Sequence, residues 1–281
     1  MNEDSSNFIA AAVLGVVEGL TEFLPVSSTG HLILVGKAIS FTGPRADSFE
    51  VFIQLGAILA VVVLYFDRFR GLLNGLFSDG LRFKSSPEFT GASGLAKIAL
   101  ACAPAFVFGA LFHKTIKEVL FNPLSVAAAL IVGGAIMLLV DNDRRVEDTK
   151  SLEEISYRQA FLLGLFQCCA LWPGTSRSGS MLVGGLLLGL SRSVAAEFSF
   201  LVAVPVMCAA TTLDLYKSRE LLSQDDVLIF AIGFVVSFIT AIVAIRTFMG
   251  LLRRFTLHPF AFYRIALGIL VLVLLRGGPA V

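Results

Sequence analysis

Long apolar stretches alternate with short polar ones along most of the chain, and their lengths give the first prediction. A helix needs about 20 predominantly apolar residues to cross a bilayer. Six stretches meet this requirement, including one that contains Pro205. The predicted spans are residues 49–66, 95–112, 122–140, 197–213, 227–246 and 259–275. We therefore expect an all-α polytopic membrane protein.

Two further regions consist of short apolar pieces on either side of a break. Residues 8–40 are interrupted by LPVSSTG, and residues 158–190 are interrupted by WPGTSRSG. Apolar pieces too short to span, broken by Pro and Gly, suggest re-entrant hairpins. Such backbone survives at membrane depth only where it is buried in protein or lines a wet cavity. We predict one re-entrant helical hairpin in each region.

The two halves of the chain repeat the same order of features. Aligning Pro25 with Pro173 sets PVSSTG against PGTSRS, and two later pairs of segments match in the same order. Each half then holds one hairpin and three transmembrane helices. Because three is odd, the second half enters the membrane upside down, which is an inverted-topology repeat. Within a single membrane domain of residues 1–281, the repeats are predicted at 8–140 and 156–276.

Composition supports a membrane location and argues against nucleic acid as a partner. The chain is 56% hydrophobic and 15% charged, with a mean hydropathy of +0.84, whereas a soluble domain has about 25% charged residues. A net charge of +1 offers no basic stripe for nucleic acid. Seven Lys and Arg residues lie on the predicted side of the termini and thirteen on the other. This bias places both termini outside and the first hairpin entering from the outer face. A homodimer is compatible with the sequence.

The break in the first hairpin carries acids and hydroxyls that lipid would not favour. Glu18 and Glu22 are four residues apart, so they share one face of a helix. Pro25 ends that helix, and the next polar residues are natural N-caps for the following one; these are Ser27, Ser28 and Thr29. The two carboxylates can hold a divalent metal ion that bridges a pyrophosphate, or one can act as a general base.

The break in the second hairpin has a similar composition and adds an arginine. Pro173 and Gly174 precede a polar run of Thr175, Ser176, Arg177 and Ser178. Two helix N-termini, several hydroxyls and one arginine form an anion site suited to phosphate. The alternative is a lone intramembrane ion pair between the glutamates and Arg177, which costs roughly a few kcal/mol per charge. The hydroxyls can also be helix caps and nothing more.

Two other polar residues have more than one interpretation. His31 can be an acid, a base, a phosphate ligand or a helix cap. Arg264 lies six residues into the last span, where it either supports the site from behind or pairs with Glu197 or another carboxylate. Trp172 and the 25 phenylalanines are mainly packing or lipid-facing residues, and some are candidates for a groove that holds an apolar tail.

At these residues a family resemblance is found. The segment GVVEGLTEFLPVSSTGH together with PGTSRSG resembles the bacterial undecaprenyl-pyrophosphate phosphatase family of the bacitracin-resistance type. The resemblance implies hydrolysis of undecaprenyl pyrophosphate to the monophosphate carrier lipid of cell-wall (peptidoglycan) synthesis. It also implies a divalent cation such as Mg or Ca, and no organic cofactor. The family's motif positions fall on Glu18, Glu22, Ser27, Ser28, Thr29, His31, Pro173, Gly174, Ser176, Arg177 and Ser178. The second motif usually continues to a threonine, where this chain has Met181.

These features combine into one mechanistic hypothesis. Glu22 takes a proton from the Ser27 hydroxyl and makes it a nucleophile, or alternatively activates a water. Arg177 holds two phosphate oxygens at once. The enzyme is expected in the bacterial inner (cytoplasmic) membrane, with its cavity facing the periplasmic or outer side and a polyprenyl pyrophosphate lipid as substrate. The rival is a transporter or flippase of a polyprenyl phosphate or another anionic substrate, because broken helices and inverted repeats are typical of transporters. A non-catalytic scaffold leaves the buried charges unexplained.

Overall fold

The computed structural model describes residues 3–79, 89–141, 148–218 and 226–277, and these residues are almost entirely helical. Their only strand-like pairing is a single bridge between Thr149 and Leu190. The helices are α1 (Glu3–Thr21), α2 (Ser28–Ala38), α3 (Pro44–Leu64), α4 (Phe66–Asp79), α5 (Gly91–Thr115), η1 (Ile116–Leu120), α6 (Pro123–Val140), α7 (Tyr157–Cys168), η2 (Cys169–Leu171), α8 (Arg177–Leu187), α9 (Arg192–Ser218), α10 (Asp226–Leu252) and α11 (His258–Gly277).

Among the described residues, six helices are long and apolar enough to cross a membrane, and they confirm the six predicted spans. These are α3, α5, α6, α9, α10 and α11. Helix α9 runs unbroken through Pro205, as expected for that span. The protein is therefore a multi-pass α-helical membrane protein. The two broken regions are each a helix, a turn and a second helix, formed by α1 with α2 and by α7 with α8.

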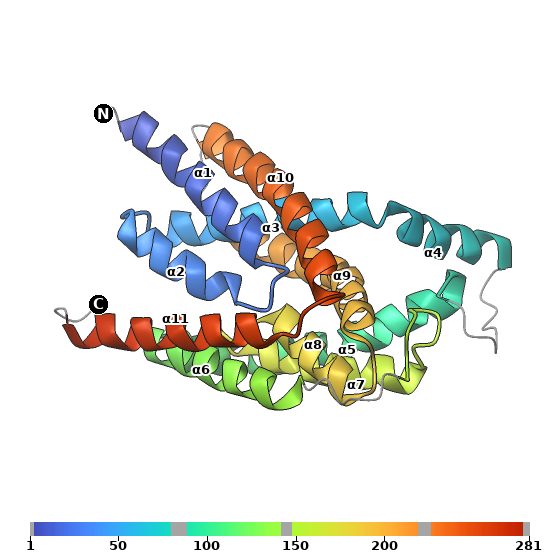
Figure 1. Ribbon diagram of the computed structural model, residues 1–281. Helices are drawn as coiled ribbons and strands as arrows, with labels where there is room; N and C mark the ends of the chain where they lie inside the picture. Colours follow the sequence, from blue (N-terminus) through green and yellow to red (C-terminus); the bar gives the residue numbers. More distant parts are fainter. Residues whose placement is uncertain (1–2, 80–88, 142–147, 219–225, 278–281) are drawn as a thin grey trace.

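The main helix pairs join one half of the chain to the other. Helix α1 packs against α10, α3 against α10, α5 against α7, and α6 against α11 (Figure 1). The contact between α1 and α10 is close because glycines stand at the crossing. A Cβ at Gly15 would lie 2.7 Å from the carbonyl oxygen of Gly233, and one at Gly19 would lie 2.5 Å from that of Ser237. The first hairpin is therefore held mainly by the C-terminal half.

Helix α4 was not among the predicted elements. Its residues are too polar for a span, but they carry one apolar face, on which Leu72 is buried. A Cβ at Gly94 would lie 2.3 Å from the Leu72 side chain, so this face of α4 packs on α5 (Figure 1). Amphipathic periodicity alone, without a span-length apolar run, was the available signal.

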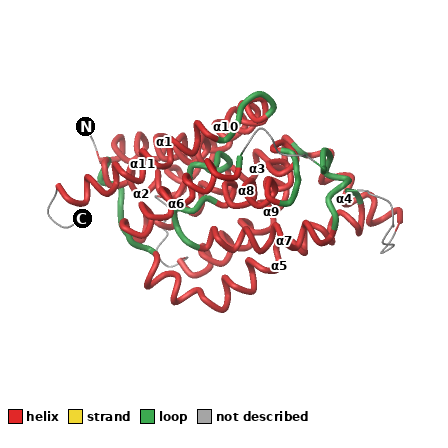
Figure 2. Tube along the Cα trace, turned by 60° about the horizontal axis from the view of Figure 1, so that its bottom comes forward, coloured by secondary structure: helices red, strands yellow, loops and turns green. Residues whose placement is uncertain are grey.

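The beginning of α1 and the end of α11 lie at the same end of the molecule (Figures 1 and 2). This arrangement agrees with an even number of crossings, as predicted. Which end faces the cytoplasm stays a prediction. Part of the charge count behind it concerns residues outside the described ranges, namely Arg82, Lys84, Arg144, Arg145 and Arg219.

Candidate functional site

The turn of each hairpin contains a serine with an unusual backbone conformation. We call residues 22–28 the first turn and residues 169–177 the second turn. Ser27 and Ser176 each have φ of 71°, in the left-handed region that non-glycine residues seldom adopt. Each caps the helix that follows, because its Oγ accepts from the N–H three residues on, at 3.4 Å for Gly30 and 3.1 Å for Gly179. The predicted N-caps are confirmed, one on each hairpin.

The two turns meet at a polar cavity of about 170 Å³. Six of the predicted site residues line it: Glu22, Ser27, Ser28, Thr29, Ser176 and Arg177. The remaining walls come from Gln54, Ala170, Pro173, Gly174 and Met207. Residues about 150 positions apart in the sequence are thus brought to one cavity, and most of its lining is polar.

Glu22 is the centre of the polar contacts in this cavity. Its Oε2 accepts a hydrogen bond of 2.6 Å from the Ser28 hydroxyl. Its Oε1 lies 3.7 Å from Nη2 of Arg177. Ser28 and Arg177 are the first residues of α2 and α8, so both helices present their N-termini to the same carboxylate. The serine in contact with Glu22 is Ser28, one residue beyond the Ser27 of the sequence hypothesis.

The guanidinium of Arg177 is hydrogen-bonded on one side, and on the other it has only the 3.7 Å contact with Glu22. Its Nη1 donates to the carbonyl oxygen and the hydroxyl of Ser199, at 2.9 and 3.2 Å. Its Nε and Nη2 are buried and have no hydrogen-bond partner. The contact with Ser199 fixes the plane of the group and leaves two of its nitrogens without a hydrogen bond.

Glu18 lies one helical turn before Glu22 and is fully buried. Both of its carboxylate oxygens lack a hydrogen-bond partner. An unpaired buried carboxylate is costly, so this position favours a proton or a cation as its partner. No cluster of three or more His, Cys, Asp or Glu side chains suited to a metal ion occurs among the described residues. Of the two neighbouring carboxylates, Glu22 lines the cavity and Glu18 lies outside its lining.

Four predicted site residues lie outside the cavity lining: Glu18, His31, Thr175 and Ser178. Nδ1 of His31 bonds to the Ser27 carbonyl oxygen at 2.7 Å, and its Nε2 bonds to the Tyr263 hydroxyl at 2.7 Å. Ser178 donates to the carbonyl oxygen of Leu24 at 2.9 Å, which ties the second hairpin to the first turn. The Thr175 hydroxyl is buried without a partner.

Arg264 supports the site from behind, which was one of the two interpretations of the sequence. Its guanidinium donates to main-chain carbonyl oxygens of both turns. The alternative pairing with Glu197 is wrong, because Glu197 bonds to Arg68 at 3.2 Å.

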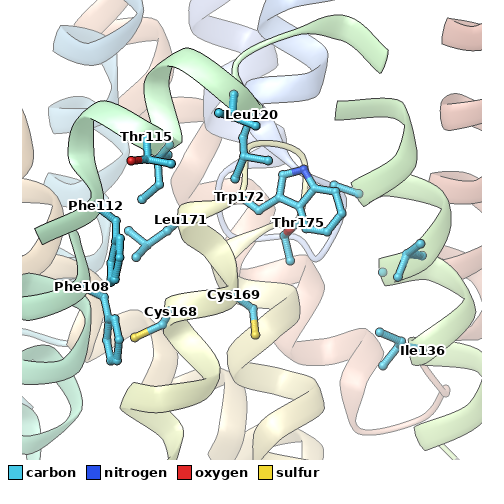
Figure 3. A pocket seen from close by; sticks show the side chains of 15 residues that line it. Phe108, Phe112, Thr115, Leu120, Ile136, Cys168, Cys169, Leu171, Trp172 and Thr175 are labelled. Carbon is cyan, nitrogen blue, oxygen red and sulfur yellow. The ribbon is translucent and has the colours of Figure 1, made fainter. Parts of the chain in front are cut away.

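An apolar groove of about 560 Å³ lies on the other side of the second turn. Figure 3 shows Phe108 and Phe112 opposite Leu171 and Trp172, with Cys168 and Cys169 below. The second turn forms a wall shared by the groove and the cavity. Cys169, Leu171, Trp172 and Thr175 line the groove, whereas Ala170, Pro173, Gly174 and Ser176 line the cavity. A polar and an apolar compartment therefore lie side by side.

Sequence reasoning missed three residues that the site uses. Gln54 lines the cavity from α3, Ser199 holds Arg177 from α9, and Tyr263 bonds to His31 from α11. Each is a polar residue inside a predicted span. A single polar position among apolar neighbours was the available signal, but it does not show which residue such a side chain meets.

Fold and site define a multi-pass membrane protein with a charged cavity between two broken-helix hairpins. The family described as bacitracin resistance protein BacA matches residues 11–270, a range that includes every residue named above in the cavity and behind it. The chain therefore belongs to this family, which is the undecaprenyl pyrophosphate phosphatase family that its motifs resemble.

Proposed function

We propose that this protein is an undecaprenyl-diphosphate phosphatase. It would hydrolyse undecaprenyl pyrophosphate to undecaprenyl phosphate and inorganic phosphate, recycle the carrier lipid for peptidoglycan synthesis and so confer bacitracin resistance. The observation that carries the proposal is the pair of free donors on Arg177 beside the Glu22–Ser28 hydrogen bond. A buried donor without a partner costs about 1–3 kcal/mol, which a ligand with several anionic oxygens would offset.

Binding of the pyrophosphate group follows from the two helix N-termini. The first turns of α2 and α8 present backbone N–H groups and a partial positive charge. Together with Nε and Nη2 of Arg177 they would stabilise charge on the phosphoryl oxygens, which is the main requirement of phosphoryl transfer. The groove behind the second turn would take the first isoprene units of the lipid, so that both parts of an amphiphile have a place.

The chemistry is assigned to Glu22 and Ser28. Glu22 takes the proton of the Ser28 hydroxyl as the oxygen attacks the terminal phosphorus. The bond from that phosphorus to the bridging oxygen breaks, and undecaprenyl phosphate leaves with the proton from Glu22. Water then attacks the phosphoserine and gives its proton to Glu22, which returns it to the Ser28 oxygen as inorganic phosphate departs. In the alternative, Glu22 activates water directly and Ser28 only binds the phosphate.

A divalent cation is part of the proposal, with Glu18 and Glu22 as its protein ligands. The unpartnered oxygens of Glu18 fit a hard cation such as Mg²⁺ or Ca²⁺. When bound, the ion would neutralise charge on the pyrophosphate oxygens. No organic cofactor is required for this chemistry.

Phosphate release by purified, detergent-solubilised protein tests the proposal. We expect release from prenyl pyrophosphates, loss of activity in excess chelator and recovery when Mg²⁺ or Ca²⁺ is restored. Full activity in chelator would contradict the cation, and no release under any condition would contradict the phosphatase.

The second candidate function is a transporter or flippase of a polyprenyl phosphate. The observation that favours it is the meeting of two broken helices at one cavity, which is typical of transporter binding sites. A transporter requires two compartments to show activity, whereas a hydrolase does not. Lipid movement in vesicles without phosphate release in detergent would favour this candidate.

The topology belongs to the same proposal: an inverted repeat, two re-entrant hairpins and a cavity open to the outer face of the bacterial inner membrane. The matching caps support the repeat, since they have the same φ and precede helices of 11 residues each. In a variant without native cysteines, labelling of intact cells at residue 3 and not at residue 148 would support the orientation. Labelling at residue 148 alone would reverse it.

A further inference from the structure

Arg264 is the largest fully buried polar side chain among the described residues, and its contacts are unusual for a buried arginine. Nη1 donates to the carbonyl oxygen of Pro25 at 3.3 Å. Nη2 donates to the carbonyl oxygens of Gly174 at 3.1 Å and Thr175 at 2.8 Å. One planar group thus binds the main chain of the first turn and of the second turn. Its other two contacts are the carbonyl oxygen of Ala129 and the sulfur of Met137, so its bonding partners are uncharged.

The neighbouring residue, Tyr263, reaches the first turn through His31. Its ring stacks on the imidazole with centroids 5.5 Å apart and planes within 6°. The Ser27 carbonyl can only accept, so Nδ1 of His31 carries the proton in that bond. In the neutral ring Nε2 then accepts from the Tyr263 hydroxyl. Both ring nitrogens are occupied, which leaves His31 without a free nitrogen for proton transfer.

We propose that Tyr263 and Arg264 are positioning residues. They hold the two turns in a fixed position relative to each other, so that Ser28 and Arg177 both reach Glu22. The inference rests on the proposed phosphatase function. It also assigns His31 to the same task, because His31 transmits the Tyr263 contact to the residue before Ser28. Lysine is not equivalent to Arg264 here, because its three donors share one nitrogen, whereas Arg264 reaches the first turn with Nη1 and the second with Nη2.

The chain contains its own reporter for one of the two turns. Trp172 is the only tryptophan, it lies within the second turn, and its Nε1 donates to the Ser125 hydroxyl at 2.7 Å. A change in the second turn should therefore change tryptophan emission, whether or not the protein is an enzyme. Arg264 contacts both turns directly, whereas Tyr263 reaches only the first turn and does so through His31, so the two residues make different predictions.

The experiment compares Arg264→Lys, Tyr263→Phe and the control Arg192→Lys. Arg192 is a partly buried arginine that pairs with Asp141 at 2.7 Å, a residue outside both turns. We expect Arg264→Lys to lower kcat about 100-fold with KM within about threefold, the effect of a small misplacement of reacting groups. Its Trp172 emission should shift. Tyr263→Phe should lower kcat about 10-fold without that shift, and Arg192→Lys should change neither.

Gly133→Ala is the second variant, in case Arg264→Lys does not fold. Alanine suits a helix better than glycine, and a Cβ at Gly133 would lie 2.3 Å from Nη2 of Arg264. It should displace the guanidinium and lower kcat with the melting temperature nearly unchanged. A short-chain prenyl pyrophosphate should be used, because Gly133 also lines the groove.

The outcomes separate the two proposals. If the wild type releases phosphate while Arg264→Lys and Gly133→Ala keep kcat within about threefold, the positioning role is wrong and the phosphatase stands. The positioning role is equally wrong if Arg192→Lys loses as much kcat as Arg264→Lys. If the wild type releases no phosphate, the phosphatase is wrong. The Trp172 emission then still tests the contact with the second turn, and an unshifted spectrum in Arg264→Lys would contradict it.

Discussion

Two clusters of charged residues in this protein use the same residue types in opposite ways. The peripheral cluster contains Arg68, Lys97, Glu153 and Glu197. Arg68 bonds to Glu153 at 2.8 Å and to Glu197 at 3.2 Å, and Lys97 donates to the Glu153 carbonyl oxygen at 3.1 Å. Its acids and bases bind one another. The central cluster contains Glu18, Glu22 and Arg177, where both Glu18 oxygens and two Arg177 nitrogens have no hydrogen-bond partner.

This difference shows which of the two clusters is complete without a ligand. The side chains of Arg68 and Glu153 are 40% and 38% exposed, so water and mutual pairing satisfy them. The side chains of Arg177 and Glu22 are 11% and 8% exposed, and at 3.7 Å their contact is too long to be a hydrogen bond. Burying charge in this incomplete state costs more than it returns. The central cluster is therefore the one that a charged ligand would complete.

The largest expected effect comes from removing the free donors of the central cluster. Arg177→Ala should lower kcat/KM about 1,000-fold, because a buried arginine on a phosphoryl group has an effect of that order. Arg177→Lys should be nearly as damaging, since a point charge cannot form the two-donor contact. Phosphate release measures both. Arg158→Ala, at an exposed position on α7 of the same hairpin, is the matched control. Near-normal turnover in Arg177→Lys would contradict a two-donor clamp.

The next largest effects distinguish the role of Glu22 as a base from the roles of Ser27 and Ser28. Glu22→Gln should lower kcat about 100-fold, the typical cost of losing a general base. Ser28→Ala should match it if the hydroxyl in contact with Glu22 is the nucleophile. Ser27→Ala should lose less, because the Ser27 hydroxyl serves as a cap. Single-turnover assays with Glu118→Gln as an exposed control measure these effects. Activity retained in Ser28→Ala but not in Glu22→Gln would make water the nucleophile.

A third prediction concerns the apolar groove, on the side formed by α6. Val132 lines the groove and is 49% exposed, so Val132→Trp should obstruct it while leaving the polar cavity unchanged. KM for a long-chain prenyl pyrophosphate should rise about 10-fold, and KM for a short-chain one should not, because only the long chain loses apolar contact. Equal effects on both substrates would place the lipid chain elsewhere.

The smallest effect is expected in the peripheral cluster. Arg68→Gln should lower the free energy of unfolding by about 0–1 kcal/mol, as for other exposed ion pairs, and leave turnover within about twofold. Partial burial acts to raise the pKa of Glu153, but hydrogen bonds from the backbone and Arg68 outweigh it and hold the pKa below its usual value. The stabilisation is therefore present above about pH 4 and lost as pH falls through the folded-state pKa. Melting curves of wild type and Arg68→Gln should converge in acid. A gap that widens in acid would contradict this assignment.

The spans and the caps could be predicted from the sequence because each depends on local information. Apolar length decides which helices can cross a bilayer, and a serine after a proline break is a natural cap, as Ser27 and Ser176 confirm. The partner of Glu22 could not be predicted. The left-handed backbone at Ser27 redirects the chain, and the hydroxyl that meets the carboxylate belongs to Ser28.

The contacts behind the cavity were also beyond sequence reasoning, for a different reason. Arg264 binds main-chain carbonyl groups, which every residue has, so no sequence pattern marks its partners. Gln54 was visible as a polar residue within an apolar stretch, but only the packing of α3 shows that it lines the cavity. Tertiary contacts determine both the partners of Arg264 and the position of Gln54.

The bond from Arg264 to Pro25 has a consequence for how the chain is made. It joins residues 239 positions apart, and α1 packs against α10, a helix of the last quarter of the chain. Glu18 and Glu22 leave the ribosome among the first residues, whereas α10, the main packing partner of α1, is synthesised near the end. The N-terminal hairpin therefore lacks its main packing partner until translation is nearly complete. A nascent chain that stops before α11 lacks the guanidinium that joins its two turns, so assembly of the site is a final event in biogenesis.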